Sequence, residues 1–222
     1  MTAAMSMPAA LSMHIESIKG QNCVSLDSFL YSTTMAPSSS TLLEPKLAAL
    51  AGKCNDPIEC SVHTLPKPLM REFRHVFGEK YQQDAMQEDG DNGTELLAIP
   101  TNQQAQEDLV AVGEEIEFEK DRLLNVFLDF GKEICDRIRA MGYWADYIDP
   151  CSGLPMITRE CNKVYSEVDG MECLLNYRAY NAGFCKVLTH PKWGTSVYPA
   201  TIFCCAPRDK VIGLVKEYQF SS

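Results

Sequence analysis

The sequence predicts an α+β domain with a mostly antiparallel sheet arranged around one long helix. Three observations support this prediction. Apolar residues recur every three or four positions from about residue 116 to residue 141, which is the period of an amphipathic helix. Shorter segments on both sides alternate apolar and polar residues, as half-buried strands do. Residues 1–54 are instead rich in Ala, Ser, Met and Thr, so we expect a disordered tail there and the folded domain at residues 55–222.

Length and composition limit the classes of function. A chain of 222 residues fits one domain with a tail. Its formal net charge of -10 argues against a general nucleic-acid binder and against a protein that binds anionic membranes. No apolar run approaches the roughly 18 residues that span a bilayer. We therefore expect a soluble protein with neither nucleic acid nor membrane as its partner.

The cysteines and the tail bear on the compartment. The ten cysteines form no Cys-x-x-Cys pair and the four histidines are scattered, so a zinc site is not indicated. Most of the thiols are expected to be small buried groups in a reducing compartment. The tail contains Glu16 and Asp27, and no arginine precedes Arg71, so it fits a mitochondrial leader poorly.

The domain is predicted to begin with a strand and a helix. Ile58, Cys60 and Val62 alternate with polar residues. A helix is expected to follow, from the prolines at positions 66 and 68 to Gly78, because Pro is favoured in the first turn and Gly after the last. Its apolar stripe consists of Leu69, Phe73, Val76 and Phe77.

The long helix follows an exposed acidic loop at residues 82–93 and two strands expected at residues 95–99 and 114–118. It begins at Ile116 or Lys120 and ends at Gly142. Burial of five of its large apolar side chains contributes on the order of 10 kcal/mol before chain entropy is subtracted, so it is a core element. Its buried stripe is predicted to contain Leu123, Leu124, Phe127, Gly131, Ile134, Cys135, Ile138 and Met141.

The remaining elements are less regular. A helix is expected within residues 171–177. The β-rich segments 184–189 and 195–205 are separated by Pro191-Lys-Trp-Gly194, which predicts a hairpin. Pro207 is expected to open a terminal helix that carries Val211, Ile212, Val215 and Tyr218.

Two stretches, residues 142–155 and 183–195, carry more aromatic, carboxylate and thiol groups than packing requires, and we expect them to meet in space. One interpretation is a Cys185 or Cys151 nucleophile with His190 as its base. Positions 185 and 190 point to opposite sides of a regular strand, which counts against such a dyad.

The other side chains of these stretches have structural alternatives. Asp146 and Asp149 could act as acid and base, but an Asp before Pro-Cys-Ser-Gly is typical of a turn whose carboxylate accepts backbone N–H groups. Trp144 and Trp193 are more often core residues than ligand platforms, although Trp193 lies in a turn. No Gly-rich phosphate-binding loop follows a predicted strand. Composition and spacing therefore name no ligand.

The same two stretches resemble a known family. Lys132-Glu-Ile-Cys135, Arg139-Ala-Met-Gly-Tyr-Trp-Ala-Asp-Tyr-Ile-Asp-Pro150 and Ser152-Gly-Leu154 are similar to the D-type cobalamin-trafficking proteins, the cblD family of methylmalonic aciduria and homocystinuria type D. The similar features that follow, in the same order, are Cys185-Lys-Val187, His190, Trp193-Gly-Thr195 and Ile202-Phe203. The resemblance covers about residues 57–217 and leaves out the tail.

The resemblance implies a domain of the flavin-reductase or nitroreductase type that is not an enzyme and binds neither flavin nor free cobalamin alone. Such a protein docks on the C-type cobalamin-processing protein, which holds the cobalamin. It directs the cofactor to methionine synthase in the cytoplasm or to methylmalonyl-CoA mutase in the mitochondrion. The residues expected to face the partner or its cobalamin are Trp144, Asp146, Tyr147, Asp149, Cys151, Phe184, His190 and Trp193.

The chain departs from the family at the presumed cobalt ligand, a cysteine thiolate. Family members have Gly-Cys-Cys-Lys where this chain has Gly183-Phe-Cys-Lys186, so Phe184 replaces the presumed ligand. Cys185 becomes the candidate cobalt ligand, although a shift of one residue reverses the face of a strand and requires a bulge or a different approach. Cys151, which stands where the family has serine, is the alternative. Sorting of cobalamin without a cobalt–sulfur bond is the third interpretation.

A function of another class also fits the implied fold. A flavin-dependent reductase would retain FMN through purification. The sequence lacks an evident cluster of phosphate-binding Arg or Lys residues, which argues against this alternative.

Overall fold

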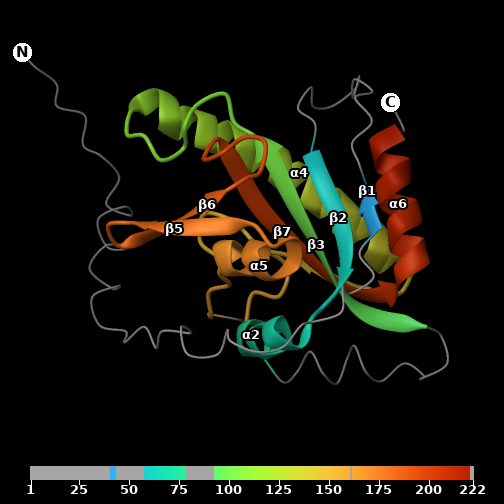
Figure 1. Cartoon of the computed structure of the whole chain (residues 1–222). Coiled ribbons are helices and arrows are strands. Elements are labelled where there is room, and N and C mark those ends of the chain that lie inside the picture. Colours follow the sequence, from blue (N-terminus) through green and yellow to red (C-terminus); the bar gives the residue numbers. More distant parts are fainter. Residues whose placement is uncertain (1–40, 44–57, 79–92, 161, 221–222) are drawn as a thin grey trace, which may run out of the picture. The chain divides into compact units, whose positions relative to one another are not determined.

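Two long strands, β3 (Thr94–Gln104) and β7 (Val197–Pro207), pair antiparallel over their whole length. They form the centre of a five-stranded antiparallel sheet with the order β1-β2-β3-β7-β4 (Figure 1). The structure is a computed structural model that describes residues 41–43, 58–78, 93–160 and 162–220. All of these residues belong to one unit, Pro37–Ser222.

The outer strands complete the sheet. β2 (Ile58–Thr64) pairs with β3, and β1 (Thr41–Leu43) pairs with β2. β4 (Trp144–Tyr147) pairs with β7 on the other side. A separate two-stranded ribbon joins β5 (Arg178–Ala182) to β6 (Cys185–Thr189).

Helices cover both faces of the sheet. α4 (Glu114–Ala140) and α6 (Arg208–Phe220) pack on one face, and α2 (Lys67–Phe77) and α5 (Glu167–Leu175) pack on the other (Figure 1). The strands alternate accordingly, because successive side chains point to opposite faces. The buried apolar residues of β3 and β7 that face α4 and α6 are Leu97, Ile99, Ala200, Ile202, Cys204 and Ala206.

Most of the predicted elements are confirmed, often with longer bounds. The strand at 58–62, the helix that ends before Gly78, the long helix and the terminal helix all form. The helix expected within 171–177 is α5, which begins earlier because the Ser166 hydroxyl accepts the Asp169 N–H. The domain is α+β with an antiparallel sheet, as the sequence predicts.

The strand expected at 95–99 continues to Gln104, past Pro100. Pro lacks the N–H that a ladder needs, and the β2–β3 ladder is interrupted at this point, between Cys60↔Thr101 and His63↔Ala98. The β3–β7 ladder runs through without a gap. The missing N–H donor therefore interrupts only the pairing of β3 with β2.

Two predicted strand arrangements are wrong. Residues 114–118 are the start of α4 and not a strand, since Ile116 and Glu119 are buried while Phe118 is 74% exposed. Segments 184–189 and 195–205 do not pair with each other. β6 pairs with β5 through the turn at Gly183-Phe184, whereas β7 enters the central sheet. Alternating residues identify a strand but not its partner.

The predicted tail and loop fall mostly outside the described residues, as does the domain boundary near residue 54. Within that tail, Thr41–Leu43 form the strand β1, which pairs with β2. The acidic loop at 82–93 is described only at Gly93. Over the ranges that the structure covers, no helix has both the length and the apolar character that a membrane crossing requires.

Replacement of two helical glycines by alanine should have opposite effects. A Cβ on Gly131 of α4 would lie 3.0 Å from Cδ2 of Tyr147 and 3.1 Å from its Cγ. The Tyr147 side chain would therefore have to shift near its attachment to the backbone. We expect Gly131→Ala to lower the free energy of unfolding by about 1–3 kcal/mol. Gly213→Ala in α6 meets nothing within 4 Å and should raise it by up to about 1 kcal/mol. Urea denaturation measures both, and a stabilising Gly131→Ala would contradict the tight packing of α4 on β4.

Candidate functional site

Residues 142–155 begin where α4 ends. Gly142 has a φ of 87°, which glycine adopts without strain, and its N–H donates to the Arg139 carbonyl at 3.0 Å. The chain then enters β4. The half-buried Trp144 indole meets the rings of Phe73 and Phe77 edge to face, with centroids 5.8 and 5.2 Å apart. Trp144 thus packs against α2. This is the packing role that was weighed against a role as a ligand platform.

Asp146 and Tyr147 lie in the interior. Oδ1 of Asp146 accepts the N–H groups of Tyr147 at 2.8 Å and Ile157 at 3.0 Å, and Oδ2 accepts the N–H of Thr158 at 2.8 Å. The carboxylate therefore holds the chain after the turn against β4. Tyr147 packs on α4. Their burial corrects the expectation that these two side chains face a partner.

Asp149 organises the turn that follows β4. Its Oδ1 accepts the Cys151 N–H at 3.0 Å and its Oδ2 accepts the Ser152 hydroxyl at 2.6 Å. The Gly153 N–H donates to the Asp149 carbonyl at 2.7 Å. This is the capped turn that the sequence predicts, in which the Asp149 carboxylate accepts one backbone N–H and one neighbouring hydroxyl.

Cys151 is exposed at this turn, but its surroundings disfavour the thiolate. Partial burial and the carboxylates of Asp149, Asp121 and Glu117 raise the pKa of the Cys151 thiol. The thiolate, and not the thiol, is the metal ligand and nucleophile. Cys151 is therefore a poor source of a thiolate at neutral pH.

The second stretch begins in the β5–β6 ribbon. Gly183, with a φ of 64°, and Phe184 form its two-residue turn, which is the tight connection that antiparallel strands favour. The Phe184 side chain is fully exposed and Cys185 beside it is exposed. The tip of the ribbon therefore presents an aromatic ring and a thiol to solvent.

An ion pair ties this ribbon to α5. The Lys186 ammonium lies 2.6 Å from Oδ1 of Asp169 and also contacts the Glu172 carboxylate. Because Lys186 follows Cys185 directly, this clamp fixes the backbone that carries the exposed thiol. All three side chains are partly exposed, so we expect the clamp to contribute little to global stability.

His190 is buried below the turn that leads to β7. Its Nδ1 accepts the N–H groups of Lys192 and Trp193, each at 3.2 Å, so Nδ1 carries no proton and Nε2 faces Oε1 of Glu59 at 3.6 Å. The Trp193 indole stacks on the imidazole at a centroid distance of 3.9 Å. The nearby His190 imidazole lowers the pKa of the Glu59 carboxyl group. His190 is thus a structural pin to β2, which corrects its predicted role at the partner surface.

α5 and the segment before it contact both stretches. The Tyr165 N–H donates to the Gly153 carbonyl at 2.8 Å in the first stretch. Leu188 of the second stretch packs in one buried cluster with Met171 of α5. The expectation that the two stretches meet is therefore supported only as far as this shared neighbour.

Sequence reasoning missed Glu167. The residue is partly exposed in the first turn of α5, but its Oε1 atom is buried and has no hydrogen-bond partner among the described residues, while Oε2 accepts the Thr201 hydroxyl at 2.5 Å. Burial raises the pKa of Glu167 to about 8. Glu72 and Tyr165 are the nearby titratable groups. No sequence signal marks this residue, because a Glu in the first turn of a helix is ordinarily solvated.

The arrangement favours presentation of a thiol over catalysis. Cys185 is exposed at the ribbon tip, whereas His190 is buried and its Nε2 faces Glu59, so the structure gives no support to a Cys185–His190 dyad. In the part of the chain that the structure describes, no group of three or more His, Cys, Asp or Glu side chains is placed to hold a metal ion.

Comparisons with known proteins find a matching family model and similar sequences. The family model of methylmalonic aciduria and homocystinuria type D protein matches residues 12–215. The match includes most of the N-terminal segment, so the expectation that the tail takes no part in the resemblance is wrong. Proteins named cobalamin trafficking protein CblD from Homo sapiens and Rattus norvegicus are 36% and 35% identical over 155 residues, or 70% of this chain. The chain spans about half the length of these curated relatives, 49% in both cases.

The buried carboxyl of Glu167 should make stability depend on pH. Between about pH 4.5 and 8 the folded chain keeps a proton that the unfolded chain has released, so this group lowers the free energy of unfolding as the pH rises. Glu167→Gln retains the shape and removes the titration. The wild-type value minus the variant value should fall with pH, with a slope that approaches about 1.4 kcal/mol per unit. Urea denaturation at pH 5, 6, 7 and 8 measures it, with exposed Glu115→Gln as the control. Equal slopes for wild type and Glu167→Gln would contradict the buried proton.

Removal of the Lys186 clamp should loosen the β5–β6 ribbon without unfolding the chain. We expect Lys186→Met to speed amide hydrogen exchange in β5 and β6 at least fivefold and to change global stability by less than about 1 kcal/mol. Lys132→Met removes an exposed ion pair with Asp136 on α4 and serves as the matched control. Unchanged exchange in the ribbon of the Lys186 variant would show that other contacts fix it.

Proposed function

Because the chain belongs to the methylmalonic aciduria and homocystinuria type D protein family, we propose that it is a cobalamin-trafficking protein that docks on the C-type cobalamin-processing protein. It acts as an adaptor with no catalysis of its own. It directs cobalamin carried by that partner toward methionine synthase in the cytoplasm and methylmalonyl-CoA mutase in the mitochondrion. The names of its curated relatives support the trafficking role.

The tip of the β5–β6 ribbon carries this proposal. Phe184 and Cys185 are exposed there, next to a lysine held by two carboxylates of α5. An exposed aromatic ring is a typical anchor for a pocket on a partner. A two-residue turn is also narrow enough to enter a cleft in which a partner holds its cofactor.

Cys185 is the cobalt ligand in this proposal. When the partner holds cobalamin, the Cys185 thiol would lose its proton to solvent and its sulfur would bind the cobalt in place of a ligand already there. A thiolate is a soft donor suited to a transition metal. Cys151 is less suited, since three carboxylates disfavour its thiolate. Phe184 then contacts the partner from the position where the family has its presumed ligand.

The fold proposal is that the domain is of the flavin-reductase or nitroreductase type. Its support is the antiparallel sheet with helices on both faces. In this proposal cobalamin is cargo shared with the partner and not a cofactor of the isolated chain. Purified protein that retains FMN would favour the flavin-dependent reductase instead.

Substitution of Cys185 tests the proposal. The full chain is mixed with the C-type protein loaded with cobalamin, and the mixture is followed by gel filtration and visible absorption. We expect one complex and a spectral change that falls at least tenfold in Cys185→Ser while the complex persists, because only the ligand is lost. Cys151→Ser and Cys173→Ser, which remove the other exposed thiols of the described chain, should keep the spectral change.

The other outcomes separate the alternatives. Absence of any complex would remove the adaptor role. Loss of the spectral change in Cys151→Ser and not in Cys185→Ser would transfer the ligand to the turn after β4. A change that appears only in Phe184→Cys, which restores the family pattern, would mean that this chain carries cobalamin without a cobalt–sulfur bond.

A further inference from the structure

Three large apolar side chains within nine residues of sequence are exposed at the start of α4 and in the loop before it. Val112 is fully exposed, Phe118 is 74% exposed and Val110 is 40% exposed. Phe118 lies about 8 Å along the helix axis from the Gly113 N-cap, at about 1.5 Å per residue. We call these three residues, with the rim of Glu114, Glu115 and Asp121, the α4 surface. The loop and the first turns of α4 are green in Figure 1.

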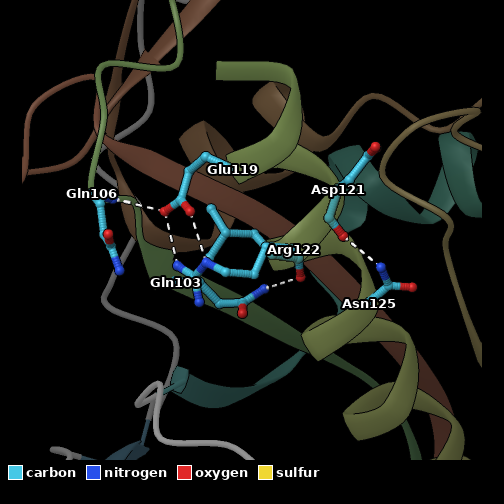
Figure 2. Close-up of polar contacts among 7 residues, drawn as sticks. Gln103, Gln106, Glu119, Asp121, Arg122 and Asn125 are labelled. Atoms are coloured by element: carbon cyan, nitrogen blue, oxygen red, sulfur yellow. Dashed lines mark hydrogen bonds and ion pairs between the residues drawn. The ribbon is translucent and has the colours of Figure 1, made fainter. Parts of the chain in front are cut away.

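The exposure belongs to a loop that is fixed at several points. The Gln106 N–H donates to Oε1 of Glu119 at 2.8 Å, and Arg122 binds the same carboxylate at 2.7 Å (Figure 2). Glu119 is only 5% exposed. The Ala105 N–H donates to the Ser196 carbonyl at 3.1 Å. The loop is therefore anchored to both α4 and the turn before β7.

Within the loop, Asp108 shapes the backbone that carries the two valines. Its Oδ1 accepts the Val110 N–H at 3.1 Å and its carbonyl accepts the Ala111 N–H at 3.0 Å. A surface that is already ordered loses little conformational entropy when a partner binds. Apolar side chains displayed on ordered backbone and rimmed by polar groups are characteristic of interaction sites.

The rim is strongly acidic. Residues 105–122 contain seven acidic and two basic side chains. Lys120 lies 2.8 Å from Oε1 of Glu117, and Arg122 binds Glu119, so both cations are engaged by carboxylates of α4 itself. Glu114, Glu115 and Asp121 are exposed. Carboxylates in the first turn favour the helix dipole, but that role does not require a neighbouring exposed aromatic ring.

The charge selects the occupant. A second copy would bring another net charge of -10 and the same acidic rim, which repel each other. Residues 1–40 contain one lysine and two acidic residues, and residues 79–92 contain one lysine and five acidic residues. Residues 44–57 contain two lysines and two acidic residues, so none of these three segments of the chain carries a net positive charge complementary to the rim. A basic segment of another protein does.

We propose that the α4 surface docks a basic, amphipathic segment of another protein, with apolar side chains against Val112 and Phe118 and Lys or Arg side chains against Glu114, Glu115 and Asp121. This site is separate in sequence from the Phe184–Cys185 tip, and it does not depend on cobalamin. It gives the chain a second contact, whose affinity depends on salt because its rim is exposed.

A peptide with this chemistry tests the proposal on the full chain. The probe is a fluorescein-labelled 15-residue helix of Leu and Lys with its leucines on one face, and its control is the same composition scrambled. Fluorescence anisotropy should give a Kd at least tenfold lower for the amphipathic peptide. Val112→Ser combined with Phe118→Ser should raise this Kd at least tenfold. Val164→Ser, at an exposed valine before α5, should leave it unchanged.

Each remaining outcome overturns the proposal. Equal binding of the scrambled peptide would reduce the effect to charge alone, and binding unaffected by the double substitution would place the peptide elsewhere. A dimer of wild type that becomes monomeric in the double variant would assign the surface to a second copy. Faster hydrogen exchange of residues 1–40 in the double variant would assign it to the chain's own N-terminal segment.

Discussion

The rest of the structure depends on the continuous antiparallel ladder between β3 and β7. These strands are far apart in sequence, yet each residue from Thr94 to Gln104 has a partner from Val197 to Pro207. Their alternating side chains divide the core into the layer under α4 and α6 and the layer under α2 and α5. The ladder also tolerates Pro100, whose missing N–H interrupts only the pairing with β2.

Both stretches with functional chemistry are attached to β7. β4 pairs with it, so the turn that carries Cys151 stands at one edge of the sheet. The turn built on His190 leads directly into it, and that turn is pinned to β2 through Glu59. Buried polar groups such as His190 and Asp146 hold these turns in place. Phe184 and Cys185, by contrast, are exposed to solvent.

Elements whose signal is local could be predicted from the sequence. The apolar period of α4 and the proline and glycine that bound α2 are properties of single segments, and both helices form. The capped turn at Asp149 was predictable for the same reason, since its partners lie within four residues. The family resemblance was carried by the same local motifs and is confirmed over residues 12–215.

Features that depend on pairing at a distance could not be predicted. β5 is a mostly exposed strand with no apolar alternation, so the sequence does not indicate its pairing with β6. The sequence therefore predicted a hairpin of β6 with β7, which does not form. The burial of Asp146, His190 and Glu167 follows from tertiary contacts, whereas charged or polar residues in isolation are expected at the surface. Of the predicted partner-facing residues, only Cys151 and Phe184 are exposed, and the candidate cobalt ligand Cys185 is exposed as well.

The central claim is that the sulfur of Cys185, at the ribbon tip, binds as a ligand to cobalt held by the partner. Cobalt X-ray absorption of the complex between this chain, the C-type protein and cobalamin measures that bond directly. The account predicts a sulfur atom among the nearest neighbours of cobalt in wild type and its replacement by oxygen or nitrogen in Cys185→Ser. Only oxygen and nitrogen neighbours in wild type, or a sulfur neighbour that persists in Cys185→Ser, would contradict it.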